Sequence, residues 1–311
     1  MDILTSFLAA TISSGTPLLY ATLGEILTEK AGNLNLGVEG MMLLGAAFSF
    51  ITGMAFGSPL LALLAGMAAG GIGALIYAFL TVTLRANQVV TGLSLTIFGT
   101  GLANFIGNSV TGLTLSNQVT GVYQRFAIPL LSKIPVIGQA FFIQSIFVYI
   151  GYIAAIVMWI YLNKTTAGLR VRTVGENPGA ADTAGIAVNG NKYIHICIGG
   201  VLSGIAGAYL SLNYSTTWQP GITGGMGWIA VALVIFSVWN PLRALFGAYI
   251  FGALRIVGFQ LQSLKINIPI QIVDMLPYAF TIIVLIMVSA RKSRKNPPPG
   301  SLSIPYFREE R

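Results

Sequence analysis

The scarcity of charged residues is the feature that most constrains what this chain can fold into. Only 8% of the 311 residues are charged, whereas 55% are hydrophobic and the mean hydropathy is +0.78. A soluble domain carries about 25% charged residues, most of them on its water-facing surface. These proportions exclude an ordinary soluble enzyme, a disordered chain and a nucleic-acid-binding domain. They predict a protein whose solvent is the lipid bilayer.

Apolar runs long enough to cross a membrane recur along the whole chain. A helix needs about 20 residues to cross roughly 30 Å of hydrocarbon, and these runs do not alternate as the strands of a membrane barrel do. We therefore predict an all-α bundle of about nine transmembrane helices, eight to ten being compatible with the pattern. They are expected near 3–27, 36–56, 59–84, 89–110, 141–162, 193–213, 226–239, 242–262 and 272–290.

Basic residues predict how the chain is oriented and divided. If the cluster at 291–295 is cytoplasmic, nine helices place 13 of the 17 Lys and Arg residues on that side. Cytoplasmic loops carry such an excess, so we expect the N-terminus outside and the C-terminus in the cytoplasm. Arg125, Lys133 and Lys265 then lie outside. The predicted parts are a permease domain at 1–290, with a cytoplasmic loop at 163–192, and a basic, proline-rich cytoplasmic tail at 291–311.

Two pairs of similar segments predict inverted repeats. Residues 58–63 resemble 240–245, and the expected topology places Pro59 and Pro241 on opposite sides of the membrane. The glycine-rich segments 33–40 and 221–227 also adjoin helices at corresponding places in the two halves. Interrupted helices in matching positions are typical of transporter substrate sites. The alternative is a pair of flexible loops at the membrane surface.

The motifs of an energy-converting enzyme are absent from the sequence. No G-x-x-x-x-G-K-[ST] phosphate-binding loop occurs, and the single histidine and single cysteine offer no metal site. We therefore expect neither a catalytic residue nor a cofactor nor a metal. Glu25, Glu29 and Glu39 are expected near a cytoplasmic boundary, without a pair facing the membrane interior. A proton-driven carrier usually has ionisable groups deep inside the membrane, and Arg255 is the one such residue expected here. The lack of a buried proton relay favours a pore that is driven by another subunit.

The cytoplasmic loop contains signals for a short surface helix. Asn177 can cap a helix that starts with Pro178, and Gly185 can end it. Arg170, Arg172 and Lys192 flank this segment. A small alanine-rich helix between two transmembrane helices suits docking into a partner's groove. A solvated loop remains the alternative.

Two segments resemble one family of membrane proteins. Residues 24–42, GEILTEKAGNLNLGVEGMM, resemble the N-terminal signature of bacterial ABC importer permeases, and 168–186 resembles that family's coupling loop. The similarity is to the ribose and branched-chain amino acid type, and within it to the nucleoside and simple-sugar branch. The resemblance implies a bacterial inner-membrane protein with a separate ATPase subunit docked on the coupling loop. It also implies a second permease, usually a longer paralogue, and an extracytoplasmic solute-binding lipoprotein.

The expected function is therefore nucleoside import as the permease subunit of an ABC importer. A simple-sugar or branched-chain amino acid permease, an ion-coupled secondary transporter, and a channel or scaffold are the alternatives. The residues expected to couple to the ATPase are Glu176, Asn177, Pro178, Ala181, Asp182 and Gly185. Amides and rings suit a neutral aromatic substrate, and the substrate path is expected at Asn35, Glu39, Asn87, Gln88, Asn104, Trp218 and Trp228.

Overall fold

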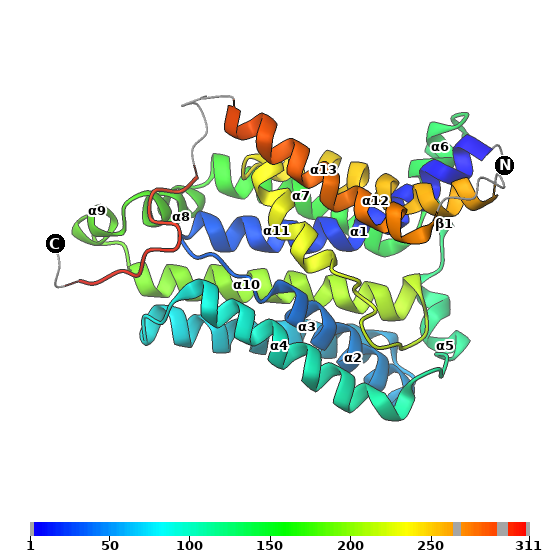
Figure 1. The fold of residues 1–311 in the computed structure, drawn as a ribbon, viewed down its shortest axis with the longest axis horizontal. Coiled ribbons are helices and arrows are strands. Elements are labelled where there is room, and N and C mark those ends of the chain that lie inside the picture. The colour runs from blue at the N-terminus through cyan, green and yellow to red at the C-terminus, as the bar shows by residue number, and fades with distance from the viewer. Residues whose placement is uncertain (1–2, 264–268, 291–297, 309–311) are drawn as a thin grey trace.

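The chain folds into a bundle of long helices, seen here in a computed structural model that describes residues 3–263, 269–290 and 298–308 (Figure 1). Helix α3 (Pro59–Ala78) continues into the π-helical turn η1 (Phe79–Thr83), and α10 (Val188–Tyr209) continues into the π-helical turn η5 (Leu210–Tyr214). The long helices are α1 (Ile3–Lys30), α2 (Val38–Phe56), α3 (Pro59–Ala78), α4 (Gln88–Gly107), α7 (Ile146–Lys164), α10 (Val188–Tyr209), α11 (Met226–Ser237), α12 (Pro241–Ser263) and α13 (Ile270–Ala290).

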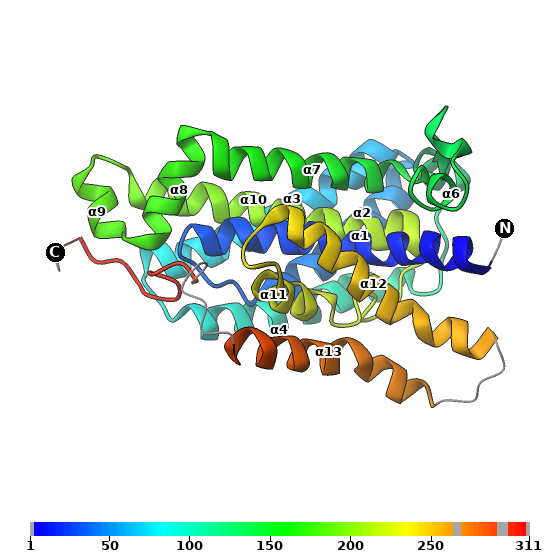
Figure 2. The same cartoon turned by 90° about the horizontal axis from the view of Figure 1, so that it is seen from above.

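Short elements cover the two ends of the bundle. Between α4 and α7 lie α5 (Asn117–Thr120), α6 (Ile137–Phe141) and the antiparallel pair β1 (Phe126–Ala127) and β2 (Ile143–Gln144). Between α7 and α10 lie α8 (Thr166–Glu176) and α9 (Pro178–Thr183). The N-terminus lies beside α6 at one end, whereas α8, α9 and the C-terminus lie at the other (Figures 1 and 2). The two loop regions therefore belong to opposite sides of the bundle.

The predicted helical membrane bundle is confirmed, with fewer full-length crossings than expected. Within the described residues, six helices are long and apolar enough to cross a membrane: α2, α3 with η1, α4, α7, α10 with η5, and α12 over Pro241–Gly258. Each of the nine expected segments coincides with one of the long helices. The difference lies in α1, which carries two glutamates and a lysine, in α11, which has 12 residues, and in α13, whose apolar part among the described residues is Gln271–Ile283. Lys265, the cluster at 291–295 and Arg311 lie outside the described residues.

Helix α11 corrects the expectation of a full crossing at 226–239. It has only 12 residues, which at 1.5 Å per residue corresponds to about 18 Å, well short of roughly 30 Å of hydrocarbon. Its first residue follows Gly224 and Gly225, both with positive φ (+54° and +78°). The chain thus enters α11 from an irregular segment in which Thr223 is buried, whereas Gln219, Pro220 and Gly221 are exposed.

Helix α1 forms the centre of the bundle. It packs on α10, α11 and α12, and Leu18, Leu19 and Leu23 are fully buried. Because other helices shield it from lipid, it can carry polar side chains that an exposed span would not tolerate. Thr22, for example, donates a hydrogen bond to the Ala230 carbonyl at 3.4 Å. This explains why a 28-residue helix with two glutamates lies inside an otherwise apolar protein.

Glycines allow α3 and α10 to pack at very short distance. A Cβ added at Gly204 would overlap the Gly66 carbonyl, and one added at Gly70 would lie 2.7 Å from the Gly204 Cα. Small residues of this kind are typical of helix–helix contacts in lipid. Pro59 and Pro241 begin α3 and α12 from opposite ends of the bundle, as an inverted repeat would require. The repeat itself stays a prediction.

Candidate functional site

The two glycine-rich segments meet inside the bundle at the side chain of Glu39. Its Oε1 accepts hydrogen bonds from Thr223 Oγ1 at 2.5 Å and from the Gly225 amide at 3.0 Å, and its Oε2 accepts one from the Gly227 amide at 2.5 Å. Glu39 is 7% exposed. A carboxylate at this position supplies the acceptors that the first amides of α11 need, and it suits the positive end of the helix dipole. The expected substrate-path residue Glu39 is therefore engaged in joining α2 to α11.

The irregular segment before α2 has its backbone satisfied by side chains from three other helices. The Leu34 amide donates to Gln88 Oε1 at 2.8 Å, and the Leu34 carbonyl accepts from Tyr77 Oη at 2.5 Å. The Asn35 amide donates to Glu25 Oε1 at 2.8 Å. Non-helical backbone is tolerated inside a membrane protein only with such partners. Asn35, Glu39 and Gln88 are thus the expected path residues that the structure brings to this junction.

Helix α1 carries two buried carboxylates near its C-terminal end. Glu25 and Glu29 lie one turn apart on the same helix, and each is only 1% exposed. They lie in the last turns of α1, near the end of the bundle that carries α8 and α9, and other parts of the protein cover them. Glu29 Oε2 accepts a hydrogen bond from Trp239 Nε1 at 2.6 Å. Glu25 therefore holds the irregular segment before α2, whereas Glu29 holds the connection between α11 and α12.

The remaining path residues are dispersed over the bundle. Asn87 caps α4 by accepting a hydrogen bond from the Val90 amide at 3.0 Å. Trp218 is 1% exposed, and its indole packs directly against Gly107. Asn104 and Trp228 are half-buried on α4 and α11. The structure therefore does not gather all seven residues around one space.

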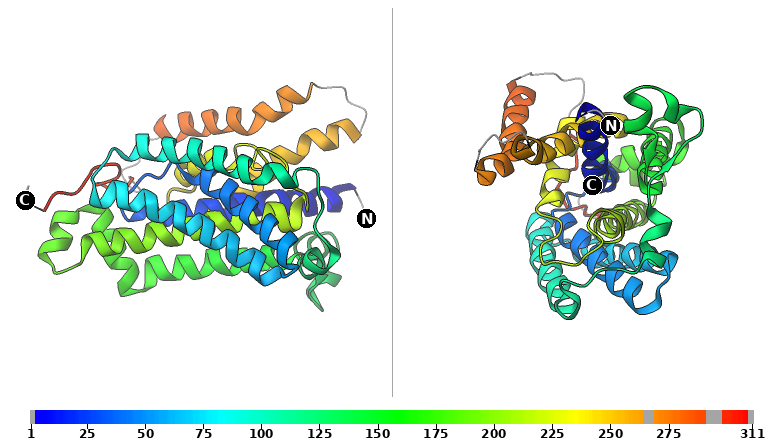
Figure 3. Two further views of the ribbon diagram at one scale, coloured as in Figure 1. Left: turned by 90° about the horizontal axis from the view of Figure 1, so that it is seen from below. Right: turned by 90° about the vertical axis from the view of Figure 1, so that its right-hand side faces the viewer.

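A cavity beside the start of α11 involves residues that the sequence did not indicate. It has a volume of about 360 Å³ and lies between α1, η5, α11, α12 and α13. Figure 3 shows the orange helices α12 and α13 along one side of the bundle. Cavities that bind small ligands typically measure about 300–1,000 Å³. An arginine within an apolar helix was the one available signal for it. Its lining residues are Ser14, Tyr214, Gly224, Ile229, Arg255, Ile256, Val273, Pro277 and Tyr278.

The cavity carries polar groups beside the irregular segment. A Cβ added at Gly224 would lie 3.7 Å from Arg255 Nη2, and one added at Gly225 would overlap Tyr278 Oη. Ser14 is 1% exposed, and its hydroxyl has no hydrogen-bond partner among the described residues. A guanidinium, two phenols and a hydroxyl can together hydrogen-bond a neutral polar molecule and stack against its ring.

The cytoplasmic loop forms the short helix that its sequence predicts. Asn177 Oδ1 accepts a hydrogen bond from the Ala180 amide at 2.9 Å, Pro178 is the first residue of α9, and Gly185 has a φ of +78°. Ala181 is fully buried, in a cluster with Val174 and Val188. It therefore holds α9 in place and cannot itself contact a partner in this conformation.

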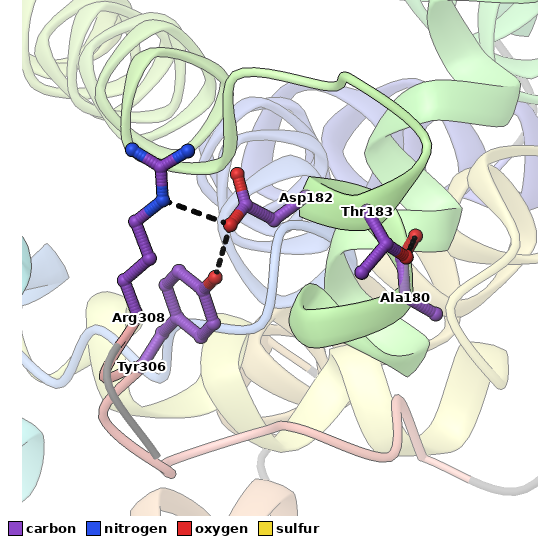
Figure 4. Close-up of polar contacts among 5 residues, drawn as sticks. All are labelled: Ala180, Asp182, Thr183, Tyr306 and Arg308. Carbon is purple, nitrogen blue, oxygen red and sulfur yellow. Dashed lines mark hydrogen bonds and ion pairs between the residues drawn. The ribbon is translucent and has the colours of Figure 1, made fainter. Parts of the chain in front are cut away.

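The exposed face of α9 differs from the expected set of coupling residues. The Asp182 side chain points toward Tyr306 and Arg308, whereas the Thr183 side chain points in another direction (Figure 4). Sequence reasoning missed Ala180, Thr183 and Ala184, because it did not show which side of the helix packs on α8. The exposed residues along this segment are Glu176, Asn177, Ala180, Thr183, Ala184 and Gly185.

Comparison with known proteins gives matches over nearly the whole chain. The family described as the permease component of branched-chain amino acid transport systems matches residues 7–285. The guanosine ABC transporter permease protein NupQ of Bacillus subtilis is 34% identical over 100% of this chain and 99% of its own length. The nucleoside ABC transporter permease protein NupC of Lactococcus lactis is 38% identical over 87% and 88%. A Haloferax volcanii protein named as a candidate glucose ABC transporter permease is 39% identical over 99% of both chains.

Proposed function

The chain belongs to the permease-component family of branched-chain amino acid transport systems, and from this membership we propose that it carries a nucleoside across the cytoplasmic membrane. It is a multi-pass membrane protein and the permease subunit of an ABC importer. It is a transport subunit rather than an enzyme, because ATP hydrolysis belongs to a separate ATPase subunit of such importers. A substrate-binding protein completes the system.

The nucleoside assignment rests on one observation, the full-length identity of 34% to a permease named for guanosine. The cavity beside α11 supports it. A nucleoside is uncharged and presents a flat ring and several hydroxyls, which suit Tyr214, Tyr278 and Arg255. We place the substrate path through this cavity and past the junction at Glu39. A sugar is the second candidate, because a relative named for glucose transport is 39% identical.

We further propose the orientation and division of the chain. The end of the bundle with α8 and α9 also carries Lys30, Lys164 and Lys192 at helix ends, which supports a cytoplasmic location under the positive-inside rule. The N-terminus is then outside. Residues 1–290 form the permease unit with its coupling loop at 163–192, and 291–311 form the cytoplasmic tail. The second permease is a non-identical, longer paralogue.

We propose that α9 transmits the power stroke. ATP binding draws the ATPase subunits together, and their contact with the exposed face of α9 moves the permease so that the cavity opens to alternate sides. A partner can shift this equilibrium only by binding α9 differently in the two states. Glu176, Asn177, Pro178 and Gly185 lie at or beside this surface, whereas Ala181 and Asp182 act from behind it by fixing the helix.

Uptake measurements test the proposed substrate. Cells or proteoliposomes with the complete importer are expected to accumulate labelled guanosine and other nucleosides, and excess unlabelled nucleoside should suppress that uptake. Glucose, ribose and leucine should not compete. Competition by glucose alone would replace the nucleoside with a sugar. Accumulation without the ATPase subunit, driven by an ion gradient, would contradict an ABC mechanism.

The cavity predicts a specific effect of Arg255. Replacing it in the variant Arg255→Met should lower nucleoside uptake by at least about tenfold, since a guanidinium that hydrogen-bonds substrate contributes roughly 1.5–3 kcal/mol. Arg255→Lys should restore part of the rate because it keeps the charge. The measurement is initial uptake alongside ATPase co-purification. Normal uptake in Arg255→Met would remove this cavity from the substrate path.

A further inference from the structure

The described part of the C-terminal tail, residues 298–308, runs back along the coupling loop. Figure 1 shows this segment passing beside α8 and α9 at the end of the bundle opposite the N-terminus. The sequence predicts only a basic, proline-rich cytoplasmic tail at 291–311, so none of these contacts was expected. Three separate contacts fix the segment, and each involves a different part of the protein.

The first contact is made by Ser301, which is 5% exposed. Its amide and its hydroxyl both donate to the Gly175 carbonyl, at 2.9 and 2.7 Å. A Cβ added at Gly32 would lie 2.5 Å from Ser301 Oγ. Ser301 therefore occupies a slot between the end of α1 and the end of α8. Next to it, the Gly300 amide donates to Glu176 Oε2 at 3.1 Å.

The second contact connects the tail to α9 itself (Figure 4). Asp182 Oδ2 accepts a hydrogen bond from Tyr306 Oη at 2.9 Å and forms an ion pair with Arg308 Nε at 3.1 Å. The Tyr306 side chain also packs on the cluster that buries Ala181. The Arg308 side chain is 73% exposed, and surface ion pairs of this kind contribute little. Tyr306 is thus the main connection.

The third contact is made by the neighbouring aromatic residue. The guanidinium of Arg85, which lies between η1 and α4, stands 4.5 Å above the ring centre of Phe307. Cation–π pairs contribute roughly 0.5–1 kcal/mol at exposed sites. The tail therefore holds α9 against both the α1 end and the α3–α4 connection.

These contacts place the tail along one side of a groove whose other side is α9. The groove has a volume of about 450 Å³. Asn177, Ala180 and Thr183 line it from α9, and Pro305, Tyr306 and Phe307 line it from the tail. None of these six side chains carries a charge. The exposed face of α9 is therefore continuous with a wall made by the tail.

We propose that the tail segment 298–308 is half of the ATPase docking site, so that the ATPase subunit inserts an uncharged, apolar side chain between α9 and Pro305–Phe307. The inference rests on the proposed docking at α9 and extends that interface to a second element. The uncharged lining excludes a charged side chain as the favoured occupant, because burying an unpaired charge is costly. Such a two-walled groove would grip α9 more firmly than contact with a single exposed helix face.

Cysteine labelling in the assembled importer tests this proposal. In a Cys197→Ala background, which removes the single native cysteine, Thr183→Cys reports on the α9 wall and Phe307→Cys on the tail wall. Ser303→Cys is the matched control, since Ser303 is exposed on the same segment outside the groove. Adding the ATPase subunit should slow maleimide labelling of both wall variants at least about tenfold, as buried interface positions exclude solvent. The control should react at an unchanged rate.

The outcomes separate this inference from the docking at α9. Protection of Thr183→Cys without protection of Phe307→Cys would overturn the role of the tail and leave docking at α9 intact. Protection of neither would overturn both. Affinity measurements add a second arm: Tyr306→Ala should weaken ATPase binding about tenfold, whereas Arg308→Ala should change it less than about twofold because its ion pair is exposed. Equal affinities for Tyr306→Ala and the unaltered chain would also overturn the proposal.

Discussion

Glu39→Ala is expected to destabilise the protein severely and to abolish transport. The substitution leaves the Gly225 and Gly227 amides and the Thr223 hydroxyl without their acceptor. Each buried donor left unpaired costs roughly 1–3 kcal/mol, so the combined loss is about 3–9 kcal/mol before relaxation. Glu39→Gln should rescue part of the loss, because its amide oxygen can still accept from Thr223 and Gly225 while its NH₂ group would face the Gly227 amide. Thermal unfolding of the purified protein measures the loss.

A matched control separates this effect from general sensitivity to mutation. Gln118 is exposed near the opposite end of α2, and Gln118→Ala should leave the melting temperature and uptake unchanged. If Glu39→Ala has an unchanged melting temperature but fails to transport, the carboxylate contacts substrate, as the sequence suggested. If it both melts and transports normally, the junction does not depend on this side chain.

Ala180→Arg is expected to eliminate ATPase docking while the permease remains folded. Ala180 is exposed on α9 and lines its groove, so a long charged side chain fills the space that the partner needs. Interface residues in such central pockets dominate binding, and their obstruction costs at least about 2 kcal/mol or roughly thirtyfold in affinity. Co-purification of the ATPase subunit and ATP-dependent uptake should both be lost. Unimpaired co-purification would exclude α9 as the docking element.

Two further variants show why the choice of Ala180 matters. Ala167→Arg places the same side chain at an exposed position of α8 outside that groove, and ATPase binding should be unaffected. Ala181→Trp is unsuitable as a docking test, although the sequence placed Ala181 at the interface. Because Ala181 is fully buried, a larger side chain would displace α9 by overpacking and would disrupt docking indirectly.

Local signals in the sequence determined a large part of this protein. Apolar length predicted the helical bundle, since lipid forces each backbone amide to be satisfied within its own helix. Asn177, Pro178 and Gly185 predicted the bounds of α9 because capping depends on a few neighbouring residues. The glycine-rich interruptions at 33–40 and 221–227 also indicated where helices break. Each of these properties depends on residues within about one or two turns of one another.

Only the tertiary structure decided which of these parts meet. Glu39 bonds residues 184–188 positions later in the chain, and Ser301 reaches Gly175 across 126. Hydropathy carries no information about such partners, because many pairings would satisfy the same buried polar groups. The cavity around Arg255, the inward face of Ala181 and the tail wall follow from how helices pack. Packing depends on the shapes of all the surfaces together rather than on any one segment.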